Sequence, residues 1–164
     1  MPDIVKVAMA DLKVARDPAV LITIGLGSCI GIALYDPVVK VGGLAHIMLP
    51  TSKRVTGGND SNPMKYADTG IDIALTKMIA MSAVKRRITA KIAGGAHMFS
   101  CAKESSSFLK IGESNAAAVK EKLSREGIRL IASDTGKDYG RTVELHTKDG
   151  SYVVKTIAKG SKVI

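Results

Sequence analysis

The chain contains few of the residues on which several common kinds of site depend. Its 164 residues include two cysteines, three histidines, four tyrosines, two phenylalanines and no tryptophan. So few aromatic side chains make a poor stacking platform for single-stranded nucleic acid. No cysteine or histidine pair has the spacing typical of zinc ligands. We therefore expect no nucleic-acid partner, no bound metal and no cofactor.

Long hydrophobic runs are also lacking. No stretch approaches 18 consecutive apolar residues, and the N-terminus has no basic segment followed by an apolar one. We expect a cytoplasmic protein with no direct membrane insertion. A reducing compartment also fits the two cysteines, Cys29 and Cys101, because a disulfide between them would consume a thiol that could act as a nucleophile. The net charge of +9 leaves an acidic protein partner open.

The chain has the length of one domain, and 46% of its residues are hydrophobic. We expect residues 1–164 to form a single α+β domain, a mixed α/β sandwich with a predominantly antiparallel sheet core and two main helices. The first helix is expected from Pro63 to about Ser82, and the second is expected to be capped by Ser114 and ended by Gly127. Strands are expected at 4–9, 20–24, 29–35, 41–49, 88–93, 128–132, 142–146 and 152–157.

The most informative stretch is a buried-type strand that runs into Gly25 and Gly27, followed by Ser28 and Cys29. Glycines there allow a tight turn or the close approach of another group to the main-chain amides. A thiol in such a turn can act as a nucleophile, and the amides can hold an oxyanion. On the evidence of these residues alone, a small buried cysteine at a strand end interrupted by glycines is a more common outcome than a reactive cysteine.

A hairpin supplies a partner for this thiol. Residues 29–35 and 41–49 are expected to pair around the turn at Asp36-Pro37. The expected register places Cys29 opposite Ile47 or His46, so the thiol and an imidazole would lie close together. A neighbouring base is what a weak nucleophile needs for activation.

These segments resemble a known family. Residues 23–29 (Thr-Ile-Gly-Leu-Gly-Ser-Cys) and 43–50 (Gly-Leu-Ala-His-Ile-Met-Leu-Pro) are similar to the signature of the chemoreceptor glutamine deamidase family, CheD. The resemblance spans nearly the whole chain, since further matching blocks follow in the family's order at 65–68, 91–96, 98–99, 111–115, 134–136 and 140–141.

The resemblance implies hydrolytic deamidation of glutamine side chains to glutamate on methyl-accepting chemotaxis receptors, with release of ammonia through a thioester. It makes Cys29 the nucleophile, His46 the general acid and base, and Thr23 the third member of the triad. Amides at Gly27 and Ser28 are candidates for the oxyanion or substrate-binding site. An activated Cys29 should have a pKa below the ordinary value of about 8.5.

The family also binds the CheC phosphatase, so the resemblance implies regulation of CheC by complex formation. Two alternatives stay open: a non-catalytic adaptor that acts mainly through CheC, and a cysteine hydrolase or transamidase with another protein substrate. A second cysteine and histidine, Cys101 and His97, match no family position with a catalytic role, and we expect neither to take part in the chemistry.

Overall fold

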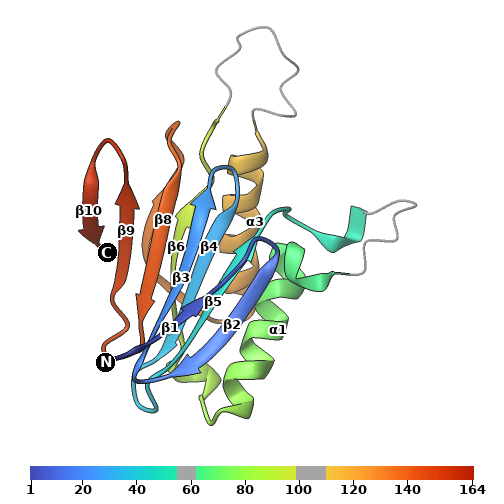
Figure 1. Ribbon diagram of the computed structural model, residues 1–164. Helices are drawn as coiled ribbons and strands as arrows, with labels where there is room; N and C mark the ends of the chain where they lie inside the picture. Colours follow the sequence, from blue (N-terminus) through green and yellow to red (C-terminus); the bar gives the residue numbers. More distant parts are fainter. Residues whose placement is uncertain (55–61, 99–109) are drawn as a thin grey trace, which may run out of the picture.

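The computed structural model describes residues 1–54, 62–98 and 110–164, and in these ranges the chain forms ten strands and two α-helices (Figure 1). The strands are β1 (Asp3–Lys6), β2 (Asp11–Arg16), β3 (Ala19–Leu26), β4 (Ile30–Asp36), β5 (Val41–Ile47), β6 (Thr89–Gly94), β7 (Arg129–Thr135), β8 (Arg141–His146), β9 (Tyr152–Thr156) and β10 (Gly160–Val163). One sheet has the order β1-β3-β8-β9-β10 and the other the order β2-β5-β4-β6-β7. Only the β1/β3 and β6/β7 pairs among the described strands are parallel, so the α+β sandwich with largely antiparallel sheets is confirmed.

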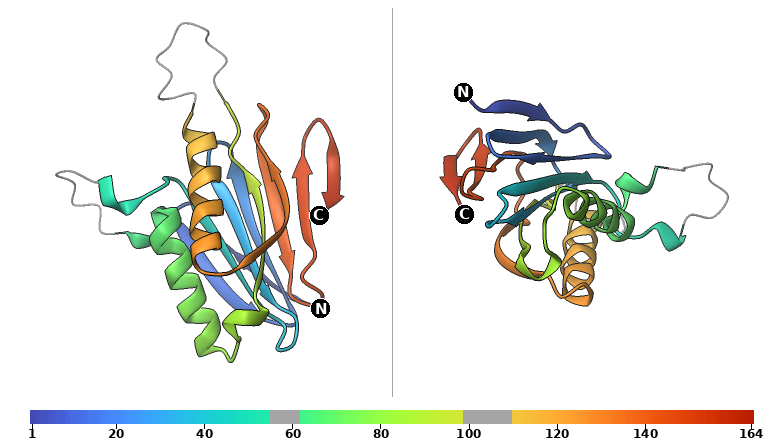
Figure 2. Two further views of the ribbon diagram at one scale, coloured as in Figure 1. Left: turned by 180° about the vertical axis from the view of Figure 1, so that it is seen from behind. Right: turned by 90° about the horizontal axis from the view of Figure 1, so that it is seen from below.

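The elements stack in three layers. Both helices, α1 (Ala67–Ala80) and α3 (Ile111–Arg125), cover one face of the β2-β5-β4-β6-β7 sheet, and the other sheet covers its opposite face (Figure 2). Short 3-10 turns at Ser52–Arg54, Pro63–Lys65 and Lys85–Arg87 join the layers. Within the described ranges, no helix combines the length and apolar composition needed to cross a membrane.

The central hairpin is buried on both faces. All seven residues of β4 and all seven of β5 are buried, as their nearly continuous apolar runs predict for a sheet with both faces covered. One apolar cluster fills the space between this sheet and the helices, and a second, which includes Cys29 and Leu44, fills the space between the two sheets. A side chain on the inner face of the hairpin therefore lies in a water-poor layer.

Some expected boundaries were wrong. Strand β2 was not expected, although Leu12 and Val14 alternate there with polar residues, and β10 was not expected either. Helix α3 begins at Ile111, so Ser114 lies inside its first turn and does not cap it. The stop at Gly127 is confirmed, because this glycine has a φ of 70° directly after the helix.

The two glycine-broken strand ends meet. Gly95 N–H donates to the carbonyl oxygen of Cys29 over 2.9 Å, and Ala96 N–H donates to that of Gly27 over 2.8 Å. Gly94 has a φ of 118°, and a Cβ at this position would stand 2.1 Å from the Cys29 carbonyl oxygen. Only glycine permits this approach, which joins the end of β6 to the segment that carries the thiol.

Candidate active site

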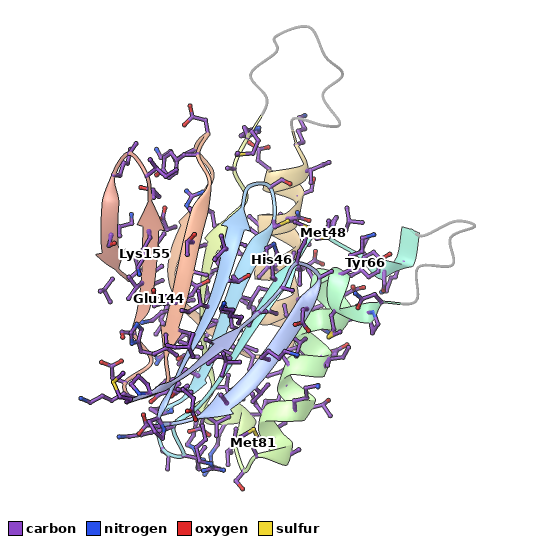
Figure 3. All side chains as sticks on the ribbon, in the orientation of Figure 1. His46, Met48, Tyr66, Met81, Glu144 and Lys155 are labelled. Carbon is purple, nitrogen blue, oxygen red and sulfur yellow. The ribbon has the colours of Figure 1, made fainter. Side chains whose placement is uncertain are left out.

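A hydrogen-bonded pair links the two sheets near one end of the central hairpin. Thr23 lies on β3 and His46 on β5, and both side chains are at most 1% exposed. The Thr23 hydroxyl lies 2.7 Å from His46 Nδ1 and donates to the carbonyl oxygen of Val7 over 2.8 Å. Figure 3 shows His46 toward the same end of the molecule as Met48, far from Met81 beyond the C-terminus of α1.

These contacts determine the tautomer of the imidazole. A hydroxyl has one proton, and here that proton goes to the Val7 carbonyl, which can only accept. The Thr23 oxygen must therefore accept a hydrogen bond from His46 Nδ1–H, which leaves the lone pair on Nε2. His46 Nε2 is buried and has no hydrogen-bond partner among the described residues. Burial lowers the pKa of His46 from 6.5 to about 4, so the imidazole is a neutral base at neutral pH.

The hairpin register differs from both expected ones, by one residue from the nearer of the two. His46 lies opposite Gly31, and Ile47 lies opposite Ile30, so Cys29 is not directly opposite either residue. Because side chains two residues apart share a face of a strand, Cys29 is the diagonal neighbour of His46 on the inner face. Its membership in the cluster between the sheets, together with Leu44, agrees with this placement. The structure thus brings Thr23, His46 and Cys29 to one end of the inter-sheet layer.

The expected low pKa of the thiol is not supported. Cys29 is 8% exposed, and burial raises its pKa above the ordinary value, although its own backbone N–H lowers it to a lesser extent. At neutral pH the site therefore holds a neutral thiol and a neutral imidazole. Such a pair can react without a preformed thiolate, because the base can take the thiol proton while the sulfur attacks.

The segment from Gly27 to Cys29 has all three carbonyls occupied. Those of Gly27 and Cys29 accept from the amides of Ala96 and Gly95, and that of Ser28 accepts from Asn115 Nδ2. In the described part of the chain, no carbonyl or side chain accepts from the amides of residues 27–29, apart from the contact of the Cys29 amide with its own thiol. Gly27 and Ser28 are both half-buried, so these amides are donors with unused capacity beside the thiol.

The other histidines do not join this site. His97 Nε2 lies 3.3 Å from a carboxylate oxygen of Glu113, and the ring is partly exposed. His146 Nε2 lies 3.2 Å from Glu144 on the outer face of β8. Cys101 lies outside the described residues, so its expected lack of a role stays a prediction.

Two buried polar residues near the thiol received no role from the sequence. Asn115 on α3 is fully buried, and Arg141 on β8 pairs with Asp134 and donates to the carbonyl oxygen of Gly94 over 3.4 Å. The only signal for either was its position in a block that matched the family. A polar side chain in the first turns of an otherwise apolar helix face, as Asn115 is, could have marked a buried contact.

Comparison with known proteins gives first the fold and then the family. The chain resembles a solved Neisseria meningitidis protein of the DUF152 family with a TM-score of 0.50 and 10% identity, over 83% of this chain and 64% of that one, which shows a shared fold alone. A family model described as CheD chemotactic sensory transduction matches residues 48–156. A probable chemoreceptor glutamine deamidase CheD from Caldanaerobacter subterraneus subsp. tengcongensis is 51% identical over 161 residues, 98% of both chains. Another with the same name, from Syntrophomonas wolfei subsp. wolfei, is 51% identical over 164 residues and the whole of both chains. The chain belongs to the CheD family.

Proposed function

We propose that this protein hydrolyses the side-chain amide of glutamine residues in chemotaxis receptors, giving glutamate and ammonia. The relatives that match it along its whole length carry the name of that activity. The observation that carries the chemistry is His46, whose Nε2 is a buried, neutral base with no hydrogen-bond partner among the described residues, on the sheet face that it shares with Cys29.

In the first half of the proposed reaction, Cys29 Sγ attacks the glutamine carboxamide carbon. The S–C bond forms while the thiol proton passes to His46 Nε2, and the carbonyl oxygen becomes an oxyanion. The imidazolium then donates that proton to the leaving nitrogen as the C–N bond breaks, which releases ammonia and leaves a thioester. Thr23 acts through His46 as a positioning residue, since it holds the ring in the tautomer with a free Nε2.

In the second half, a water molecule attacks the thioester carbon while His46 Nε2 takes one of its protons. Collapse of this second tetrahedral intermediate breaks the S–C bond, and the proton returns to the sulfur. The product is a glutamic acid side chain, which releases its proton to solvent and becomes glutamate, and the site returns to the original neutral pair. The amides at Gly27, Ser28 and Cys29, which have no acceptor in the described part of the chain apart from the thiol of Cys29 itself, are the proposed donors to both oxyanions.

The experiment that tests this proposal is incubation of the protein with a purified cytoplasmic receptor fragment. Peptide mass spectrometry would detect the small mass gain that accompanies conversion of a glutamine amide to an acid. We expect this gain at specific glutamines with the wild type and none with Cys29→Ala. An unchanged receptor fragment after incubation with the wild type would contradict the proposal.

We also propose regulation of a CheC-type phosphatase by complex formation, which rests on the family resemblance. Cys29→Ala should still bind CheC, because the buried thiol contributes little to the outer surface. If the wild type binds CheC and deamidates nothing, the adaptor alternative replaces the enzyme. If it deamidates other proteins and spares receptors, a hydrolase or transamidase with another protein substrate does.

A further inference from the structure

We propose that Asn115 is a positioning residue that sets the orientation of the Ser28–Cys29 peptide and thereby aims the Cys29 amide at the oxyanion. This inference rests on the proposed deamidation at Cys29. It assigns a role to a helix residue that touches neither the thiol nor the imidazole through any hydrogen bond in the described structure.

The contacts of Asn115 leave one orientation for its side-chain amide. The side chain is fully buried, and Nδ2 lies 2.9 Å from the carbonyl oxygen of Ser28 and 2.9 Å from that of Met48. Both neighbours are carbonyls, which only accept hydrogen bonds, so the NH₂ group must face them. Asn115 therefore uses both of its donors on main-chain groups of two separate segments.

The first contact determines where the next amide points. The carbonyl of Ser28 and the N–H of Cys29 belong to one planar trans peptide, in which the two bonds point in opposite directions. Because the carbonyl points toward α3, the Cys29 N–H points away from α3. That amide has no acceptor among the described residues except its own thiol, so it is available to a substrate oxygen.

The second contact holds the other half of the site. Met48 follows directly after β5, two residues beyond His46. Asn115 is therefore hydrogen-bonded to the chain beside both the proposed nucleophile and the proposed base. Stability alone does not account for the arrangement, because Asn115 Oδ1 is buried with no partner in the described residues. A buried acceptor without a partner is unfavourable and calls for an explanation.

The test uses two variants at Asn115 and one matched control. Asn115→Asp keeps the shape and places carboxylate oxygens against the two carbonyls, whereas Asn115→Ser is smaller, uncharged and keeps one donor. Thr147→Val is the control, because the Thr147 hydroxyl is fully buried and makes two main-chain hydrogen bonds, both to Ala19 at the opposite end of β3. For each protein, kcat and KM for receptor deamidation are measured beside the rate at which iodoacetamide alkylates Cys29 at mildly alkaline pH.

Alkylation requires an accessible thiol but does not require an oxyanion donor. Comparing the alkylation rate with kcat for deamidation therefore separates an effect on the thiol from an effect on the amide. We expect kcat to fall about 10- to 100-fold in whichever Asn115 variant folds, below the roughly 100- to 1,000-fold cost of deleting an oxyanion donor. KM should stay within about twofold of wild type, and the alkylation rate should change much less than kcat, because the Cys29 amide is the smaller influence on the thiol pKa. Thr147→Val should leave kcat within about twofold of wild type.

Three results would overturn the inference. A folded Asn115 variant with wild-type kcat would show that the side chain has no part in positioning. An equal fall in kcat and alkylation would place its effect on the thiol itself rather than on the amide. No deamidation by the wild type would refute the proposed function, and this inference with it, whereas the first two results leave the proposed function intact.

Discussion

The hydroxyl of Thr23 accepts a hydrogen bond from His46 Nδ1 over 2.7 Å while it donates to the carbonyl oxygen of Val7. This relationship makes a neutral residue sufficient as the third member of the proposed site. Thr23 cannot stabilise an imidazolium as a carboxylate would, but its one proton is committed to Val7, so the ring must present Nε2 as a base. The low pKa of His46 follows from the same environment, which is buried and holds no carboxylate partner for the ring in the described structure.

Thr23→Val should lower kcat for deamidation by about 10- to 100-fold, because it leaves a buried N–H donor without a partner, a change worth about 1–3 kcal/mol. Thr23→Ser keeps the hydroxyl and should stay within a few fold of wild type. Steady-state kinetics on the receptor fragment measures both. Equal losses in the two variants would indicate that Thr23 matters for packing and not for the hydrogen bond.

The three residues proposed for the site could be named from the resemblance of the sequence to a family, but their arrangement could not. Both expected registers were wrong, the nearer by one residue, because Lys40 takes a φ of 52° in the turn, which lets Asp36 pair with Val41. A non-glycine residue in the left-handed region leaves no mark in the sequence. The burial of Cys29 was also unpredictable, since it depends on the second sheet.

Asn115 shows a further limit of sequence reasoning. Its two acceptors lie 87 and 67 positions away in the chain and are main-chain groups. No residue type at those positions records the contact, so a pattern cannot reveal it. The helices and most strands were predictable because their signals, apolar periodicity and glycine stops, are local.

Loss of either reacting group should abolish or nearly abolish turnover. Cys29→Ala removes the proposed nucleophile, and His46→Ala should reduce kcat by about 100- to 10,000-fold, the usual worth of a positioned acid and base. His97→Ala and His146→Ala are the matched controls and should be nearly silent, because their rings pair with Glu113 and Glu144 instead. A larger loss in either control than in His46→Ala, measured by mass spectrometry of receptor peptides, would place the site elsewhere.

In the pH profile of kcat/KM, the rise on the acidic side should lie at an unusually low pH. Burial lowers the pKa of His46 to about 4, and the reaction needs the neutral ring, so activity should rise as pH increases through about 4 and not through 6.5. Alkylation of Cys29 without substrate should instead increase steadily above neutral pH, because burial raises the thiol pKa. A labelling rate that is already maximal at mildly acidic pH would show a preformed thiolate and contradict this assignment.

An ion pair far from the site should affect stability and leave catalysis unchanged. Asp36 is fully buried and accepts hydrogen bonds from Arg87 and from the amides of Val38 and Val84. Arg87→Ala should lower the free energy of unfolding by about 3 kcal/mol, since it leaves the buried charge of Asp36 without its ion-pair partner. Arg125→Ala is the control, because its pair with Glu121 is exposed and such pairs contribute about 0–1 kcal/mol. Urea unfolding at neutral pH measures both, and equal effects would refute the argument.

The neutral state of His46 can be tested without any substrate, through the stability of the fold. The unfolded chain binds a proton at His46 below pH 6.5, whereas the folded chain does so only below about pH 4. The unfolded state therefore holds more protons between these values, and the fold loses stability as pH decreases through that window. This loss of stability should total on the order of 3 kcal/mol. It should be absent above about pH 7 and nearly complete near pH 4. His46→Gln has no titrating ring, so the difference in unfolding free energy between it and the wild type should change by this amount, as measured by urea titrations at several pH values. A difference that is independent of pH would mean that His46 titrates alike in both states, and the buried neutral base on which the mechanism depends would be refuted.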